Sequence, residues 1–161
     1  MRPRAATGVR LNLLVLVVAT QLAGATLPSP VLAHHSHPYF YDQCRTITVE
    51  GLIGSVQWKD PHTPVVLKLD DGTTYAVDWM GLRGLTNSRV VGPAQAALVP
   101  GARVAVTGNP IRTLAQIREH VPDYKYEVNP RTIDPRLIRR VDDSFTWTQQ
   151  DSHNPPDCGG R

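Results

Sequence analysis

Apolar and polar residues alternate in several short runs of this chain, which is the pattern of half-buried β-strands. The first run is rich in β-branched residues, and Gly51 and Gly54 break its alternation, which predicts one long strand with a bulge or a sharp bend. Strands are expected over residues 46–59, 65–69, 74–79, 102–107 and, as a hairpin or bent strand, 136–148. Their apolar faces predict a core made of Val49, Ile53, Val56, Leu67, Leu69, Val77, Val104, Val106 and Ile138.

Turn-forming residues separate the alternating runs. Residues 60–64 contain two prolines and predict a turn, because proline fixes φ and cannot donate to a strand ladder. Asp71-Gly72 predicts a tight hairpin, because these residues tolerate the positive φ values that such a turn needs. Two longer segments, 80–99 and 122–135, contain several glycines or prolines and are expected to be irregular, the second as an inserted loop.

Helices are predicted for two short segments of the chain. Residues 93–98 predict one or two helical turns starting at a proline, and residues 111–121 predict a short helix with apolar residues near a 3.6-residue period. Three strands, a short helix and two or three further strands follow the order of an OB-type barrel, a five-stranded, partly open Greek key. An immunoglobulin-like sandwich needs about seven short strands. The expected fold class is therefore all-β with one or two short helices, as a small OB-type partly open β-barrel.

Residues 1–33 have the layout of a cleavable secretory leader. A segment with arginines and no acidic residue precedes an apolar stretch over 11–25, and Val31 and Ala33 stand at positions minus three and minus one of a cleavage site. A membrane span needs about 20 apolar residues, whereas this stretch is shorter and contains polar residues. Cleavage would make His34 the first residue of an exported protein, periplasmic or extracellular, with no membrane anchor.

The exported chain divides into three parts by its composition. Residues 34–45 are expected to form an extended, histidine-rich N-terminal arm, 46–148 the barrel domain, and 149–161 a flexible tail. The combined length of the three parts is that of one domain, since a single domain typically has 50 to 250 residues.

The charge of the full chain comes from its leader. There are 17 lysines and arginines against 14 acidic residues, but three of the arginines lie in the leader, so the exported part has no net charge. Nucleic-acid binding usually shows as a basic patch or stripe, and no such partner is expected. Arg136, Arg139 and Arg140 are interpreted as a solvated strand face.

Cys44 and Cys158 are the two cysteines of the chain. An even count in an exported protein favours a disulfide, and closing so long a loop would stabilise the fold by about 4 kcal/mol or more in the loop-entropy model. The alternative is two free thiols, because Cys158 lies in the expected flexible tail. No Cys-x-x-Cys motif is present, so neither a thioredoxin-type site nor covalently attached haem is indicated.

Four motifs occur together: Ala33-His34-His35-Ser36, Gly54-Ser-Val-Gln-Trp58, Asp60-Pro61-His62, and the segment from Pro100 to Gly108. They resemble a family of small exported bacterial proteins described only as a domain of unknown function. Its members typically begin the mature chain with His-His-Ser and carry an Asn-Pro-His turn, in which Asp60 here replaces the asparagine. The resemblance covers residues 34–108 and, more weakly, 136–147. It implies an exported small β-barrel and brings no established activity.

A histidine at a newly formed N-terminus offers a metal ion both its α-amine and its imidazole. A second imidazole completes a T-shaped set of three nitrogens, and nitrogen ligands in tetragonal geometry suit copper(II). His34 would supply the amine and one ring, and His35, His37 or His62 the third nitrogen. His62 is favoured because a turn at the barrel mouth lies where the arm can fold over it. The candidate metal ligands are therefore His34, His35 and His62, for copper or another divalent ion.

A solvated histidine cluster is the alternative to a metal site. Such a cluster binds any divalent ion weakly, and His62 would then cap its turn through a backbone hydrogen bond. No catalytic residue is assigned, because Ser36 beside the histidines lacks a third group to complete a triad. Trp58 and Trp79 end adjacent strands and are interpreted as barrel packing rather than as an aromatic ledge for a ligand.

Two functions remain open at this stage. The first is a periplasmic binding module for a metal or a small ligand. The second is a structural or partner-interaction protein of the cell envelope, without metal and without catalysis. An enzyme is not expected, and an oxidative copper enzyme built on the N-terminal histidine has no further support in the sequence.

Overall fold

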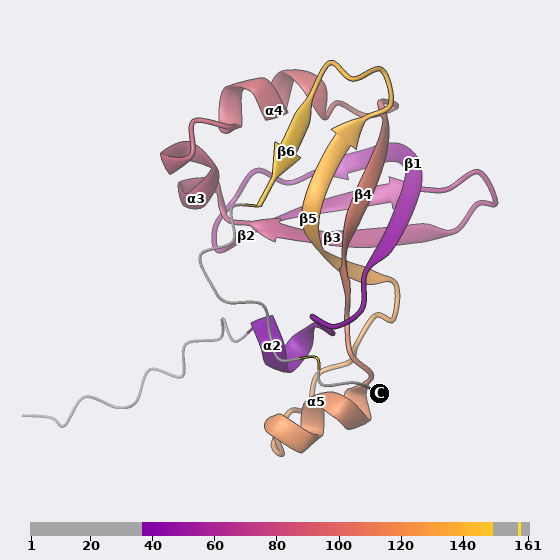
Figure 1. Ribbon diagram of the computed structural model, residues 1–161, viewed down its shortest axis with the longest axis vertical. Helices are drawn as coiled ribbons and strands as arrows, with labels where there is room; N and C mark the ends of the chain where they lie inside the picture. The colour runs from indigo at the N-terminus through magenta and orange to yellow at the C-terminus, as the bar shows by residue number, and fades with distance from the viewer. Residues whose placement is uncertain (1–36, 150–157, 159–161) are drawn as a thin grey trace, which may run out of the picture. The chain divides into compact units, whose positions relative to one another are not determined.

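Six strands form one sheet, and five of them close into a barrel. The computed structural model describes residues 37–149 and Cys158. Neighbouring strands follow the order β3-β2-β1-β4-β5-β6, and a parallel pairing of β3 with β5 closes the barrel, which confirms the predicted OB-type fold (Figure 1). The strands are β1 (Ile47–Val56), β2 (His62–Lys68), β3 (Thr74–Met80), β4 (Arg103–Pro110), β5 (Thr132–Arg140) and β6 (Thr146–Thr148).

Short helices occupy the connections of the barrel. α2 (His37–Phe40) precedes β1, α3 (Leu82–Asn87) and α4 (Val91–Ala97) connect β3 to β4, and α5 (Leu114–His120) connects β4 to β5. In the view of Figure 1, α3 and α4 lie towards one end of the barrel and α2 and α5 towards the other. The helix predicted after β4 is confirmed as α5, which begins with a reciprocal capping box between Thr113 and Gln116.

Two helices were not expected from the sequence. The arm is not extended throughout, because α2 turns it over His37–Phe40, and Pro38 in the first turn is compatible with a helix. α3 precedes the predicted helical turns of the β3–β4 connection. It starts after Gly81, which provides no side-chain cap, so the usual sequence marker of a helix start is missing.

Pro64 and Pro135 lie inside strands, which corrects the predicted turn before β2 and the predicted loop before β5. β2 begins at His62 and contains Pro64, and β5 begins at Thr132 and contains Pro135. The carbonyl of Pro64 accepts a hydrogen bond from the backbone N–H of Gln57 at 3.0 Å. Proline is tolerated in a strand wherever the ladder does not need its missing N–H, so these residues do not end the strands.

β1 is the long, bent strand that the glycines predicted. Its register against β2 shifts between Ile53 and Ser55, around Gly54. Gly51 approaches β2 so closely that a Cβ there would stand 2.7 Å from the carbonyl oxygen of Lys68. The bend lets the first half of β1 pair with β4 and the second half with β2, as closure of a small barrel requires.

The β2–β3 hairpin turns at Asp71-Gly72, as predicted. Gly72 has a φ of 83°, and the Asp71 carboxylate accepts hydrogen bonds from the backbone N–H and the hydroxyl of Thr73. Beside this turn, Asp70 pairs with Arg103 of β4 at 2.9 Å. This end of the hairpin is opposite to the end at which β2 begins and β3 finishes.

The barrel interior is apolar, and the predicted core is largely confirmed, with Val56 and Leu69 only partly buried. Trp79 is fully buried, and its ring centroid lies 6.2 Å from that of Trp58 and 5.2 Å from that of Trp147. This confirms barrel packing for the two strand-end tryptophans. None of the helices within the described ranges has the length and apolar character of a membrane span.

Cys44 and Cys158 form a disulfide, so the alternative of two free thiols is wrong. The bond joins the segment before β1 to the tail after β6 across a sequence separation of 114 residues. Cys158 is thereby held next to the N-terminal arm, although most of the tail lies outside the described residues.

Candidate functional site

The barrel closes along a seam between β3 and β5, and two aspartates follow this seam. The strands pair in parallel, with Val77 opposite Ile133, and Asp78 and Asp134 are the next residue of each strand. Adjacent strands lie about 4.8 Å apart. Because side chains alternate between the two faces of a strand, the aspartates leave the core face on which Val77 and Ile133 are buried.

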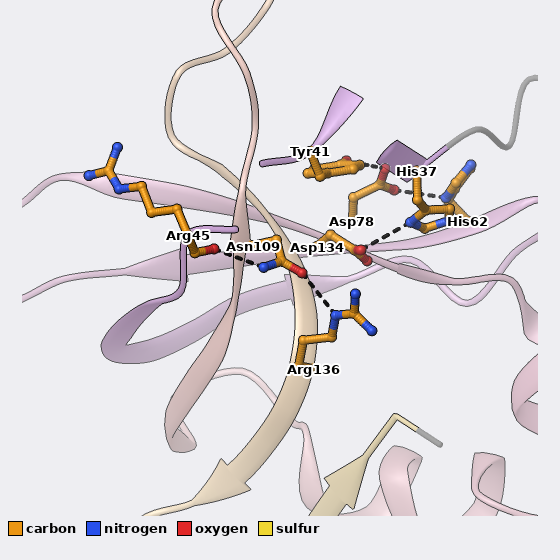
Figure 2. A network of polar contacts seen from close by, with 8 residues as sticks. All are labelled: His37, Tyr41, Arg45, His62, Asp78, Asn109, Asp134 and Arg136. Atoms are coloured by element: carbon orange, nitrogen blue, oxygen red, sulfur yellow. Dashed lines mark hydrogen bonds and ion pairs between the residues drawn. The ribbon is translucent and has the colours of Figure 1, made fainter. Parts of the chain in front are cut away.

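Asp78 connects the N-terminal arm to β2. One of its carboxylate oxygens accepts a hydrogen bond from the Tyr41 hydroxyl at 2.6 Å, and the other lies 2.9 Å from Nδ1 of His62 (Figure 2). Pro64 stands opposite Asp78 in the β2–β3 ladder, so His62, two residues earlier, reaches Asp78 as a diagonal neighbour on the same face. Since an ionised carboxylate only accepts hydrogen bonds, it selects the His62 tautomer with the proton on Nδ1.

Asp134 holds a second histidine. Its Oδ2 lies 3.0 Å from Nδ1 of His37, and the residue is 4% exposed. The hydrogen bond to Asp134 raises the pKa of His37 above its ordinary value, while burial of the ring opposes the increase. The negative charge of Asp78 also raises the pKa of His37, and the positive charge of Arg136 lowers it. The histidine therefore interacts with both aspartates of the seam.

Tyr41 anchors the arm to this site. Its side chain is buried, and burial together with the neighbouring Asp78 raises the pKa of Tyr41 well above its ordinary value. The phenol therefore stays protonated and acts as a hydrogen-bond donor, not as an acid or a nucleophile. Backbone contacts hold the same stretch of chain, because Tyr41 bridges to Ile111 and Asp42 N–H donates to the carbonyl of Pro110 at 2.9 Å.

A buried amide holds the arm further along the chain. Asn109 is 3% exposed, donates to the carbonyl of Arg45 at 2.8 Å and accepts from Nε of Arg136 at 2.8 Å (Figure 2). The interpretation of Arg136 as part of a solvated strand face is therefore wrong. Arg139 and Arg140 pair with exposed aspartates of the following turn, which agrees better with a solvated strand face.

The site presents two imidazoles whose Nδ1 atoms both face carboxylates. A histidine held in this way is fixed in orientation, and its Nε2 carries the lone pair. Metal-ligating histidines almost always have such an outer partner on their other nitrogen. Across residues 37–149 and Cys158, however, no group of three or more histidine, cysteine or acidic side chains is arranged to hold a metal ion.

Of the predicted metal ligands, His62 lies within the described residues, where its Nδ1 pairs with Asp78. His34 and His35 lie outside the described residues, as does the predicted signal peptide, so export and metal binding stay predictions. Sequence reasoning did not find the Asp78 and Asp134 pairs, because no local motif marks two aspartates on strands far apart in the chain.

Comparisons with known proteins place the chain in a family without assigning its function. The sequence model of a family of unknown function, DUF6152, matches residues 22–117, and the chain belongs to this family. The match includes Asp78 and ends before Asp134. No curated protein matches. Among solved structures, the S. pombe Stn1–Ten1 complex is similar over 60% of this chain and 58% of that chain, with 13% sequence identity and a TM-score of 0.40.

Proposed function

We propose that this member of the DUF6152 family is an exported β-barrel module that binds copper(II). The amine and ring of His34 and the ring of His62 are the proposed ligands. His35 is the alternative source of the third nitrogen. The observation that carries the proposal is the carboxylate of Asp78, which binds both Tyr41 of the arm and His62 of β2. The arm that follows the expected new N-terminus is thereby anchored at the carboxylate that orients His62.

Chain length limits how far His34 can lie from His37. His34 precedes His37 by three residues, and three residues of extended chain span at most about 11 Å. His37 itself is bound at the seam through Asp134. The carboxylate of Asp78 lies on Nδ1 of His62, and such an outer partner raises the basicity of a ligating imidazole.

Export would create the ligand. The α-amine at His34 does not exist until the leader is removed, so the site would not load copper before cleavage. An α-amine has an ordinary pKa of about 7.7–8.0 and an imidazole of about 6.5, and both must lose a proton to coordinate a metal. Copper binding is therefore expected near neutral pH and above.

The test compares two forms of the full exported chain, one beginning at His34 and one with a single glycine added before it. Each is titrated with Cu(II) alone by calorimetry. The native N-terminus is expected to bind one copper at least about tenfold more tightly, since the added residue moves the amine away from the His34 ring. Equal affinities would contradict the proposal and favour the structural or partner-interaction alternative.

A matched pair of variants tests the contribution of β2. His62→Ala is expected to weaken copper binding, whereas His120→Ala is expected to leave it unchanged, because His120 stacks on Tyr39 at 5.3 Å between ring centroids and lies on α5. If His35 provides the third nitrogen, His62→Ala has no effect and His35→Ala does.

Mass spectrometry of the exported protein tests the leader. A species that begins at His34 and carries one disulfide is expected. A membrane-bound form that retains Met1 would contradict both the export and the ligand set.

A further inference from the structure

We infer that an aromatic surface on α2, α5 and the loop after α5 binds a neutral, β-1,4-linked polysaccharide. This aromatic surface consists of Tyr39, Phe40, His120, Tyr124 and Tyr126. It contains none of the proposed copper ligands, so the inference does not depend on the proposed function. The match to the family model ends at residue 117, before three of these five rings.

Ring contacts join the aromatic surface across three segments of the chain. Tyr39 of α2 stacks on His120 of α5, with their ring centroids 5.3 Å apart. Phe40, the next residue of α2, meets Tyr124 edge-on at 5.4 Å, and Tyr124 meets Tyr126 edge-on at 5.5 Å. Both series of rings include a residue of α2, which lies at the same end of the barrel as α5 (Figure 1). The five rings therefore belong to one region of the molecule.

Two of these rings are largely open to water. Tyr126 is 66% exposed and Tyr39 is 44% exposed, whereas Phe40 and Tyr124 are half-buried. A single exposed aromatic ring is ordinary in a folded protein. Several in contact with one another are typical of a surface that binds a partner or a ligand.

Hydrogen bonds to backbone carbonyls hold the segments that carry the rings. Arg118 donates through Nε to the carbonyl of Tyr124 at 3.0 Å. Arg112 donates through its backbone N–H to the carbonyl of Phe40 at 2.8 Å and through Nε to that of Pro38 at 3.2 Å. Because the rings are positioned before a ligand arrives, binding loses less conformational entropy.

The charged side chains of this region favour a neutral ligand. Residues 112–127 contain three basic and three acidic side chains, which are Arg112, Arg118, Lys125, Glu119, Asp123 and Glu127. All of them except Arg112 are exposed. Nucleic acids and anionic membranes are bound by an excess of lysine and arginine, so the balance of charge disfavours both.

A sugar polymer matches aromatic rings that have polar side chains around them. Each pyranose ring has a face of C–H groups, whose hydrogens are attracted to the negative face of an aromatic ring. Its hydroxyl groups lie at the edge of the ring, where carboxylates accept and basic side chains donate hydrogen bonds. β-1,4 linkages keep successive sugar rings extended and flat, so one polysaccharide chain can contact more than one aromatic ring.

The test is affinity electrophoresis of the folded, disulfide-bonded protein in native gels that contain hydroxyethylcellulose or glycol chitin. Both polymers are expected to retard the parent protein. Tyr126→Ala is expected to weaken the apparent affinity about fivefold or more, as truncation of an aromatic contact residue does, and Tyr39→Ala is expected to act in the same direction. Val141→Ala is the unchanged control, because Val141 is 44% exposed and lies after β5.

Further measurements distinguish a binding role of the rings from a structural one. Tyr126→Phe keeps the ring and is expected to keep most of the retardation. Nuclear magnetic resonance of the unaltered protein avoids any folding defect, because cellohexaose should shift the ring signals of Tyr39 and Tyr126 but not those of the buried Trp79.

Three results would overturn the inference. The first is a parent protein that neither polymer retards, and the second is equal retardation of the parent and Tyr126→Ala. The third is binding to phosphatidylglycerol vesicles without binding to either polymer, which would assign the aromatic surface to a membrane instead.

Discussion

The two ends of the β2–β3 hairpin hold carboxylates with nitrogen partners in opposite environments. At the turn, Asp70 pairs with Arg103 at 2.9 Å, and the Asp70 side chain is 75% exposed. At the other end, Asp78 binds His62, and Asp134 of the adjoining strand β5 binds His37, with its side chain 6% exposed. The distances are alike, so burial and not proximity distinguishes the two regions.

This difference changes what each pair does. Arg103 lowers the pKa of Asp70 through hydrogen bonding and charge, but water screens an exposed pair, which therefore stabilises a protein little. A buried aspartate that loses its partner keeps the cost of desolvation without the compensating bond. The seam end is thus the sensitive region, and its groups hold the arm in place.

The largest expected effect comes from the disulfide that joins the N-terminal arm to the tail. Replacing Cys44 and Cys158 by serine removes a cross-link over 114 residues of sequence separation, which corresponds to about 4–5 kcal/mol of unfolding free energy in the loop-entropy model. Urea denaturation of the double variant against the oxidised protein measures the loss. An unchanged denaturation midpoint would show that the noncovalent contacts of the arm suffice.

The comparison is tested directly by removing one carboxylate from the seam and one from the hairpin turn. Asp134→Ala is expected to reduce the unfolding free energy by about 1–3 kcal/mol, because it leaves the Nδ1 donor of His37 without its acceptor in a partly buried position. Asp70→Ala is expected to leave the melting midpoint within experimental error. Equal shifts at both ends, measured by thermal denaturation, would refute the distinction.

A smaller effect is expected at the anchor of the arm. Tyr41→Phe keeps the buried ring and removes the hydrogen bond to Asp78, which is expected to cost about 0.5–1.5 kcal/mol of unfolding free energy. Tyr126→Phe is the matched control, because Tyr126 is 66% exposed. If both variants unfold at the same urea concentration as the parent, Tyr41 does not anchor the arm.

The smallest effect concerns pH. The pKa of His37 is raised in the folded protein, so its contribution to stability is fully present below its unfolded value of about 6.5 and is lost as the pH rises through the folded value. The side chain is 37% exposed, which keeps the effect small. In metal-free protein, the melting temperature of the parent should exceed that of His37→Gln by more at pH 6 than at pH 8.5. A difference that grows with pH would contradict the sign.

Local patterns were sufficient to predict most of the barrel. Alternation identified the strands, Asp71-Gly72 identified the hairpin, and Gly54 identified the bend of β1. The predictions failed where a residue type is compatible with more than one local structure. Pro64 stops a strand in the general case, but here the ladder does not need its N–H.

The amino-acid sequence by itself determined which segments become strands, because side-chain periodicity and turn residues act within a few positions of one another. It also limited the disulfide to one pair of cysteines. Only the tertiary structure decided that Asp78 and Asp134 stand next to each other, since the parallel pairing of β3 with β5 joins residues that no local propensity relates. Burial of Asp134 beneath the arm follows from the same closure. A nonlocal pairing depends on the free energy of the whole barrel. For this reason local sequence patterns could not predict that the two aspartates form one candidate site.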